Sequence, residues 1–122
     1  MTQEEKQLLL KDLCARLSYG VKIIDEPAHC LGELFLISTT DMVEYETETD
    51  TGMQTIYNIK PYLRPMSSMT EEEKEEYDKT FDWDYSIQGT PFDWLNAHHF
   101  DYRNLIEKGL ALEATKDMYK TE

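Results

Sequence analysis

Helix-start signals on both sides of a long stretch of alternating residues constrain this chain to an α+β fold. Thr2 and Thr70 are each followed three residues later by a glutamate, and Thr90 precedes a proline and then an aspartate. A threonine hydroxyl at such a position accepts a hydrogen bond from the first turn of a helix, and the acid bonds back to the backbone. The predicted helices span residues 3 to about 17–19, 71–79, 91 to about 98–99, and 101–108.

Between the first two helix starts the hydrophobic period changes from four residues to two. Leu9, Leu13 and Leu17 repeat every four residues, whereas residues 21–60 are β-branched or alternate. The predicted strands cover 21–24, 31–40, 42–49 and 54–60, with a hairpin turn at 50–52. The strand over 31–40 is apolar on both faces, so we expect it to be covered on both sides.

The prolines at 61 and 65 predict an end to the sheet. Proline has no backbone N–H, so residues 60–69 are expected to form an extended crossing segment rather than a strand. We therefore predict an α+β fold in which a small antiparallel sheet of about four strands packs with an N-terminal helix and two or three short C-terminal helices. The 122 residues suit a single domain over 1–122, with 115–122 as a frayed tail.

The net charge of −13 excludes some functions. Phosphate contacts need lysine and arginine, so direct nucleic-acid binding is not expected. No apolar run reaches the 18 or so residues of a membrane span, and no signal peptide is apparent, so we expect a cytoplasmic protein without membrane contact. Cys14 and Cys30 predict free thiols, with Cys14 inert on the apolar face of the first helix.

The acidic excess is concentrated in the predicted sheet. Residues 25–60 hold eight acids and one base, a net of −7. Four of the acids alternate along one predicted strand and would form a row on one face while Val43 and Tyr45 face the core. These are the candidate partner-binding residues: Glu44, Glu46, Glu48 and Asp50.

This acidic row has more than one interpretation. It can be the solvated face of an edge strand, where charge discourages aggregation. It can instead be a surface for a basic partner protein, with fast, salt-sensitive association. A calcium site is the weakest interpretation, because the acids do not follow the twelve-residue loop pattern.

A second candidate site combines arginine with aromatic residues. Arginine suits bidentate recognition of phosphate or carboxylate, and aromatic rings can line a ligand pocket or simply close the core from outside. The candidate ligand-binding residues are Arg64, Arg103, Trp83 and Trp94.

No motif for metal binding or catalysis stands out. His98 and His99 are adjacent, so on a helix they point about 100° apart and cannot both face one ion. Cys30 follows His29, but neighbours in sequence rarely form a catalytic pair, and no third residue is apparent to orient them. We therefore expect no catalytic residue, no metal and no cofactor.

Two stretches, 59–70 (IKPYLRPMSSMT) and 93–103 (DWLNAHHFDYR), with the continuation LIEKGLALEA, resemble a group of uncharacterised proteins. These are short acidic proteins encoded by gut anaerobic bacteria and by their phages and mobile elements. The resemblance runs from the first helix to Ala114 and is weakest over 41–55 and 78–90. It implies an intracellular accessory protein and assigns no residue a role.

The leading hypothesis is therefore a non-enzymatic acidic accessory protein that binds a partner through its surface. Its most specific form is a phage- or mobile-element-encoded inhibitor of a basic, nucleic-acid-binding host protein. The alternatives are a protein that binds or sequesters a nucleotide-like small ligand, and a structural protein that oligomerises.

Overall fold

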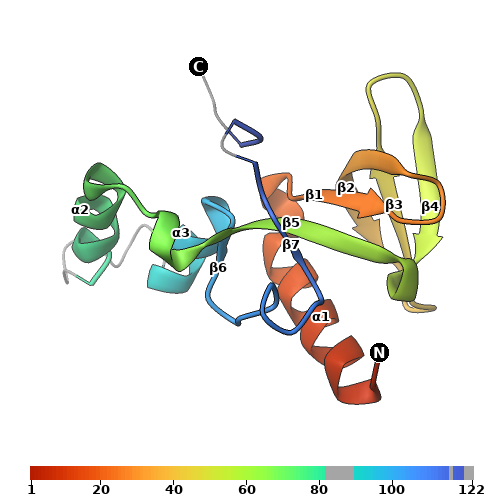
Figure 1. Ribbon diagram of the computed structural model, residues 1–122, viewed down its shortest axis with the longest axis horizontal. Coiled ribbons are helices and arrows are strands. Elements are labelled where there is room, and N and C mark those ends of the chain that lie inside the picture. The colour runs from red at the N-terminus through yellow and green to blue at the C-terminus, as the bar shows by residue number, and fades with distance from the viewer. Residues whose placement is uncertain (82–89, 116, 120–122) are drawn as a thin grey trace.

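The computed structural model describes residues 1–81, 90–115 and 117–119, and it confirms the α+β class (Figure 1). Strands β1–β4 lie at one end of the molecule and α2 at the other, with β5 running between them. The strands are β1 (Lys22–Asp25), β2 (Cys30–Ile37), β3 (Met42–Glu46), β4 (Thr51–Thr55), β5 (Ile59–Pro65), β6 (Phe100–Asp101) and β7 (Leu112–Glu113).

The helices begin where the threonines predict. They are α1 (Gln3–Arg16), α2 (Glu71–Lys79) and α3 (Pro91–Ala97). Thr2, Thr70 and Thr90 each form the capping box with the acid three residues on. A short 3₁₀ helix, η1 (Leu17–Tyr19), extends α1 and ends at Gly20, whose φ of 70° is left-handed. Two more 3₁₀ helices, η2 (Ile56–Asn58) and η3 (Met66–Ser68), flank β5.

The sheet is larger than predicted. Its order is β4-β3-β2-β1-β5-β6, with β7 also paired to β5, which makes seven strands instead of about four. Strands β1 to β4 form an antiparallel meander, yet β5 follows β4 in sequence and pairs with β1. Only η2 spans the gap between β4 and β5, and its Asn58 carbonyl accepts a hydrogen bond from Glu26 N (3.0 Å). The two additional short strands pair with β5 in parallel.

One apolar core joins the sheet to α1. Leu9 and Leu13 of α1 are fully buried in the same cluster as the inward-facing strand residues Ile23, Leu34 and Val43. Burial of Leu9 and Leu13 agrees with the four-residue period of the sequence. Cys14, predicted to share that face, is instead exposed, because α1 buries a narrower stripe than its leucines suggest.

The prolines do not end the sheet, so the predicted crossing segment over 60–69 is wrong for its first half. Pro61 is the Cα partner of Ile23 within β5. Glu26 and Asn58 form a hydrogen-bonded pair, because Glu26 N donates to Asn58 O. Hydrogen-bonded and non-hydrogen-bonded pairs alternate along an antiparallel ladder, so Pro61 belongs to a non-hydrogen-bonded pair. Its missing N–H therefore removes no hydrogen bond to β1. Pro65 is the last residue of β5 and starts η3.

The β3–β4 hairpin is shorter than predicted, and its turn lies elsewhere. The strands end at Glu46 and begin again at Thr51, and Thr47 closes the loop by donating its N–H to Asp50 O (2.7 Å). The Thr47 hydroxyl also accepts from Asp50 N (3.0 Å), a local bond that competes with the strand ladder. Gly52 is in β4 and not in the turn: a Cβ there would lie 2.4 Å from Tyr45 Cζ, so glycine gives the Tyr45 ring its space.

One expectation about the C-terminal part is also wrong. No helix follows Asp101, which lies in β6: residues 102–103 form a bend and residues 105–109 a turn, in which the Asp101 carboxylate accepts from Leu105 N (2.9 Å) and Ile106 N (3.0 Å). Gly109 is left-handed (φ 77°), as expected, and Leu110 N bonds back to Leu105 O (2.9 Å). The predicted frayed tail is anchored at Tyr119, whose hydroxyl bonds to the sheet; residues 116 and 120–122 lie outside the described part.

Candidate interaction surface

The predicted row of four carboxylates is reduced to two. Glu44 and Glu46 lie on β3 and face outward, while Val43 and Tyr45, which alternate with them, are buried, as the alternation predicts. Glu48 and Asp50 fall in the hairpin loop, where the Asp50 carboxylate accepts from Thr51 N (2.8 Å). The acids also do not lie on an edge strand, because β3 is flanked by β2 and β4.

Register brings a third carboxylate to this face. Glu33 of β2 is the direct cross-strand partner of Glu46. Like charges directly opposite one another destabilise a sheet. Among the described residues, no lysine or arginine nitrogen lies within 4.0 Å of the carboxylates of Glu33, Glu44 or Glu46. Even Lys22, the β1 neighbour of Glu33, has its Nζ over the Tyr119 ring, 5.9 Å from the centroid.

Apolar side chains are exposed beside these acids because β2 carries a bulge. Its register shifts between Leu34 and Leu36, so Phe35 and Leu36 together oppose Glu44. Leu34 is only 2% exposed, whereas Phe35 and Leu36 are 43% and 39% exposed. The prediction that the strand over 31–40 is covered on both sides is therefore wrong.

Two further apolar residues extend this exposed area. Met53 of β4, 57% exposed, is the cross-strand partner of Glu44, and Leu31 of β2, 48% exposed, is two residues before Glu33. We call this set the outer face: Leu31, Glu33, Phe35, Leu36, Glu44, Glu46 and Met53. An exposed cluster of large apolar side chains is typical of a contact surface, whereas single exposed ones are ordinary.

The free edge of β4, beside the outer face, is poorly suited to pairing with an added strand. Because Thr47 N bonds to Asp50 O and Ile56 N to Asp41 O, the backbone groups of Thr51, Met53 and Thr55 face the free edge of β4. The N–H groups of Thr51 and Thr55 are already bonded, to Asp50 Oδ1 (2.8 Å) and to Gln54 Oε1 (2.9 Å). This edge therefore offers few donors to an added strand.

A buried polar network holds the strands behind the outer face. The Asp25 carboxylate, in a residue 3% exposed, accepts from Tyr45 Oη (2.7 Å), Gln54 Nε2 (3.0 Å) and Ala28 N (3.3 Å). Burial raises the pKa of Asp25, but the three hydrogen bonds together lower it below its usual value. Burial and the nearby Asp25 carboxylate also raise the pKa of Tyr45. Gln54 of β4 thus bonds directly to β1, although β3 and β2 lie between these two strands in the sheet.

The two arginines predicted to bind a ligand are each engaged by a carboxylate. Arg64 makes two bonds of 2.7 Å to Glu73 and lies 4.2 Å from the Phe100 ring centroid. Its hydrogen bonds lower the pKa of Glu73 to about 2, outweighing partial burial. Arg103 Nη1 bonds to Asp12 Oδ1 (2.7 Å). These contacts join β5 to α2, and they join the segment that follows β6 to α1.

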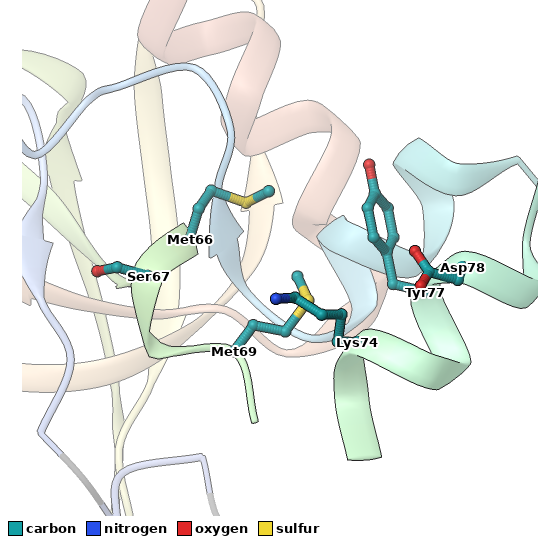
Figure 2. A pocket seen from close by; sticks show the side chains of 6 residues that line it. All are labelled: Met66, Ser67, Met69, Lys74, Tyr77 and Asp78. Carbon is teal, nitrogen blue, oxygen red and sulfur yellow. The ribbon is translucent and has the colours of Figure 1, made fainter. Parts of the chain in front are cut away.

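Of the two aromatic residues of the second candidate site, only Trp94 lies in the described part of the chain. Trp94 is half-buried and stacks on His98, with ring centroids 4.0 Å apart. Trp83 lies outside the described residues. A pocket of about 320 Å³ lies between η3 and α2, and Figure 2 shows that its lining holds none of the predicted ligand residues. The lining residues are Met66, Ser67, Met69, Lys74, Tyr77 and Asp78.

The histidines and cysteines do not gather into a site. His99 is 8% exposed, and burial first, then the Arg16 charge, lowers its pKa to about 4, so it is neutral at pH 7. In the described parts of the chain, no three His, Cys, Asp or Glu residues could hold a metal ion together. Within those parts, no helix has the length and apolar character needed to cross a membrane.

The comparisons with known proteins add no relative. No family model matches the chain, and no curated protein or solved structure matches it. The resemblance to short acidic proteins of gut anaerobes and their phages therefore stays a prediction.

Proposed function

We propose that this chain is a non-enzymatic binding protein whose outer face docks a partner protein with a basic and apolar surface. The observation that carries the proposal is the combination on one sheet face of four exposed large apolar residues with three carboxylates that have no lysine or arginine nitrogen within 4.0 Å in the described part of the chain. Neither half of this combination stabilises the isolated chain.

The apolar half would supply binding free energy. Phe35, Leu36 and Met53 are 43%, 39% and 57% exposed and lie around Glu44. Burying apolar area yields about 25 cal/mol per Å², and large side chains at the centre of an interface contribute most. The bulge and the buried Asp25 network hold these side chains on a rigid support, which limits the entropy lost on binding.

The acidic half would select the partner. Glu33 and Glu46 lie opposite each other and repel, so an arginine or lysine placed between them removes a cost as well as adding an attraction. The overall charge of −13 would speed association with a positive surface and reject acidic ones. A second copy of the chain, equally acidic, is a poor occupant of this face.

A more specific form of the proposal is inhibition of a nucleic-acid-binding protein. Such proteins carry the basic surface that the outer face requires. Duplex DNA or RNA would then compete with this chain for the partner, whereas a basic protein that binds elsewhere would be indifferent to nucleic acid.

The test is the salt dependence of capture from a cell lysate. We expect proteins retained on the immobilised chain at low salt to have basic surfaces and to bind about tenfold more weakly when the salt is raised to several hundred millimolar. Capture that does not depend on salt, or captured proteins without a basic surface, would contradict the proposal. Light scattering of the chain alone checks the alternative that it assembles with itself.

A further inference from the structure

The hydroxyl of Tyr119 lies between two strands where a direct backbone bond would be expected. Ile24 and Lys60 are cross-strand partners, so Lys22 and Tyr62 would form the next hydrogen-bonded pair of β1 and β5. Instead, Lys22 N donates to Tyr119 Oη (2.7 Å), and Tyr119 Oη donates to the Tyr62 carbonyl (2.7 Å). One oxygen atom from the C-terminal segment therefore bridges the two strands.

The ring of Tyr119 also has a defined place. It stacks on the His99 ring with centroids 3.7 Å apart and an angle of 17° between the planes. His99 lies in the left-handed region (φ 64°) and donates no bond from Nδ1, which is buried without a partner. The Lys22 Nζ lies over the Tyr119 ring, 5.9 Å from its centroid. We call the Lys22 N–H, the Tyr62 carbonyl and the His99 ring the Tyr119 seat.

The chemistry of this seat is selective. Its polar part offers one donor, Lys22 N, and two carbonyl acceptors, of which Tyr62 O (2.7 Å) lies much closer to the hydroxyl than Lys22 O (3.5 Å). A hydroxyl satisfies the donor and the nearer acceptor together because it accepts and donates at the same oxygen. A phenolate could not donate to the Tyr62 carbonyl, and burial raises the pKa of Tyr119 so that the neutral form persists. The exposed plane of the His99 ring favours a ligand with an aromatic ring, which can stack on it.

We propose that the Tyr119 seat is a binding site for a neutral phenol ring, occupied in this structure by the chain's own C-terminal segment. The segment thus acts as an intramolecular ligand that joins β1 to β5. A phenol-bearing molecule or a tyrosine of another chain would compete for the same three groups. The seat adjoins the outer face, because its Lys22 is the cross-strand partner of Glu33, but it does not depend on the function proposed above.

The test uses the full-length Tyr119→Ala variant and small aromatic probes. We expect 4-methylphenol to bind the variant about tenfold more tightly than toluene, which fills the ring position but makes neither hydrogen bond. 4-Methylanisole can accept from Lys22 N but cannot donate, so it should bind with intermediate affinity. The wild-type chain, whose seat is filled, is the control and should bind 4-methylphenol at least tenfold more weakly than the variant.

Equal affinity of the variant for 4-methylphenol and toluene, or equal binding by the wild type, would overturn the proposal. If Tyr119→Ala does not fold, Tyr119→Phe keeps the ring and removes only the bridging hydroxyl. Amide hydrogen exchange at Lys22 should then rise about tenfold more than exchange at Tyr45 in the β3 ladder. Unchanged relative exchange at Lys22 would also overturn it.

Discussion

Asp12→Ala is expected to lower the free energy of unfolding by about 3–5 kcal/mol, a large part of the stability of a single domain. Asp12 and Arg16 are both 0% exposed and form two bonds, of 2.8 and 3.1 Å. The Asp12 carboxylate also accepts from Arg103. Without it, Arg16 keeps its bond to the Phe100 carbonyl but remains a buried charge without a counterion.

Urea unfolding at pH 7 measures this effect, and Glu4→Ala is a matched control on the same helix. Glu4 is exposed, so its removal should change the free energy of unfolding by less than about 0.5 kcal/mol. If Asp12→Ala unfolds at the same urea concentration as Glu4→Ala, the buried ion pair does not hold α1 to the 100–103 segment as described.

Asp25→Ala is expected to have the second largest effect, about 2–4 kcal/mol, because it leaves Tyr45 Oη and Gln54 Nε2 buried or half-buried without their acceptor. Tyr45→Phe removes one of these bonds and should cost about 1 kcal/mol. Thermal or urea unfolding of the two variants gives the comparison. An equal loss in both would show that the hydrogen bond from Gln54 to Asp25 does not contribute to stability.

The Asp25 network also predicts an acid dependence. The pKa of Asp25 is lowered below its usual 3.8 in the folded chain, so its contribution to stability is full above that value. The contribution is lost as the pH falls from about 4 through the folded pKa. Asp25→Asn, which has no carboxylate to protonate, should unfold with a weaker pH dependence than the wild type below pH 4. An identical pH dependence would mean that Asp25 is not held ionised.

The helices could be predicted because their signals are local. The capping boxes at Thr2 and Thr70 need only residues three apart, and the helices begin there. The α+β class followed from the same signals together with the change of period. The place of Tyr119 could not be predicted, for the converse reason: its hydroxyl is bonded to Lys22 and Tyr62, which are far away in sequence.

The sheet could be predicted only in part because its details depend on which residues are paired across neighbouring strands. Gly52 resembles a turn glycine, but its role is set by the Tyr45 ring on the next strand. Pro61 resembles a strand terminator, yet the pairing with β1 leaves it at a position that needs no N–H. Neither fact is visible without knowledge of the register.

The candidate surface shows the same division. Alternation placed Glu44 and Glu46 outward, with Tyr45 inward, as observed. It could not reveal that Glu33 pairs with Glu46, nor that a bulge in β2 turns Leu36 outward beside Glu44. The apolar half of the outer face, without which the acids would be ordinary surface charge, comes entirely from that bulge and from cross-strand pairing.

The central claim is tested most directly by measuring partner binding of two charge-matched variants. One variant replaces Glu33, Glu44 and Glu46 of the outer face with glutamine. The other replaces three exposed acids of α2 with glutamine: Glu71, Glu72 and Glu75. Each change removes three negative charges, so the two chains have the same net charge. The account predicts that the α2 variant binds a captured basic partner as the wild type does, while the outer-face variant binds at least tenfold more weakly. Equal weakening of both variants would show that only net charge matters and would contradict a docking site on the outer face.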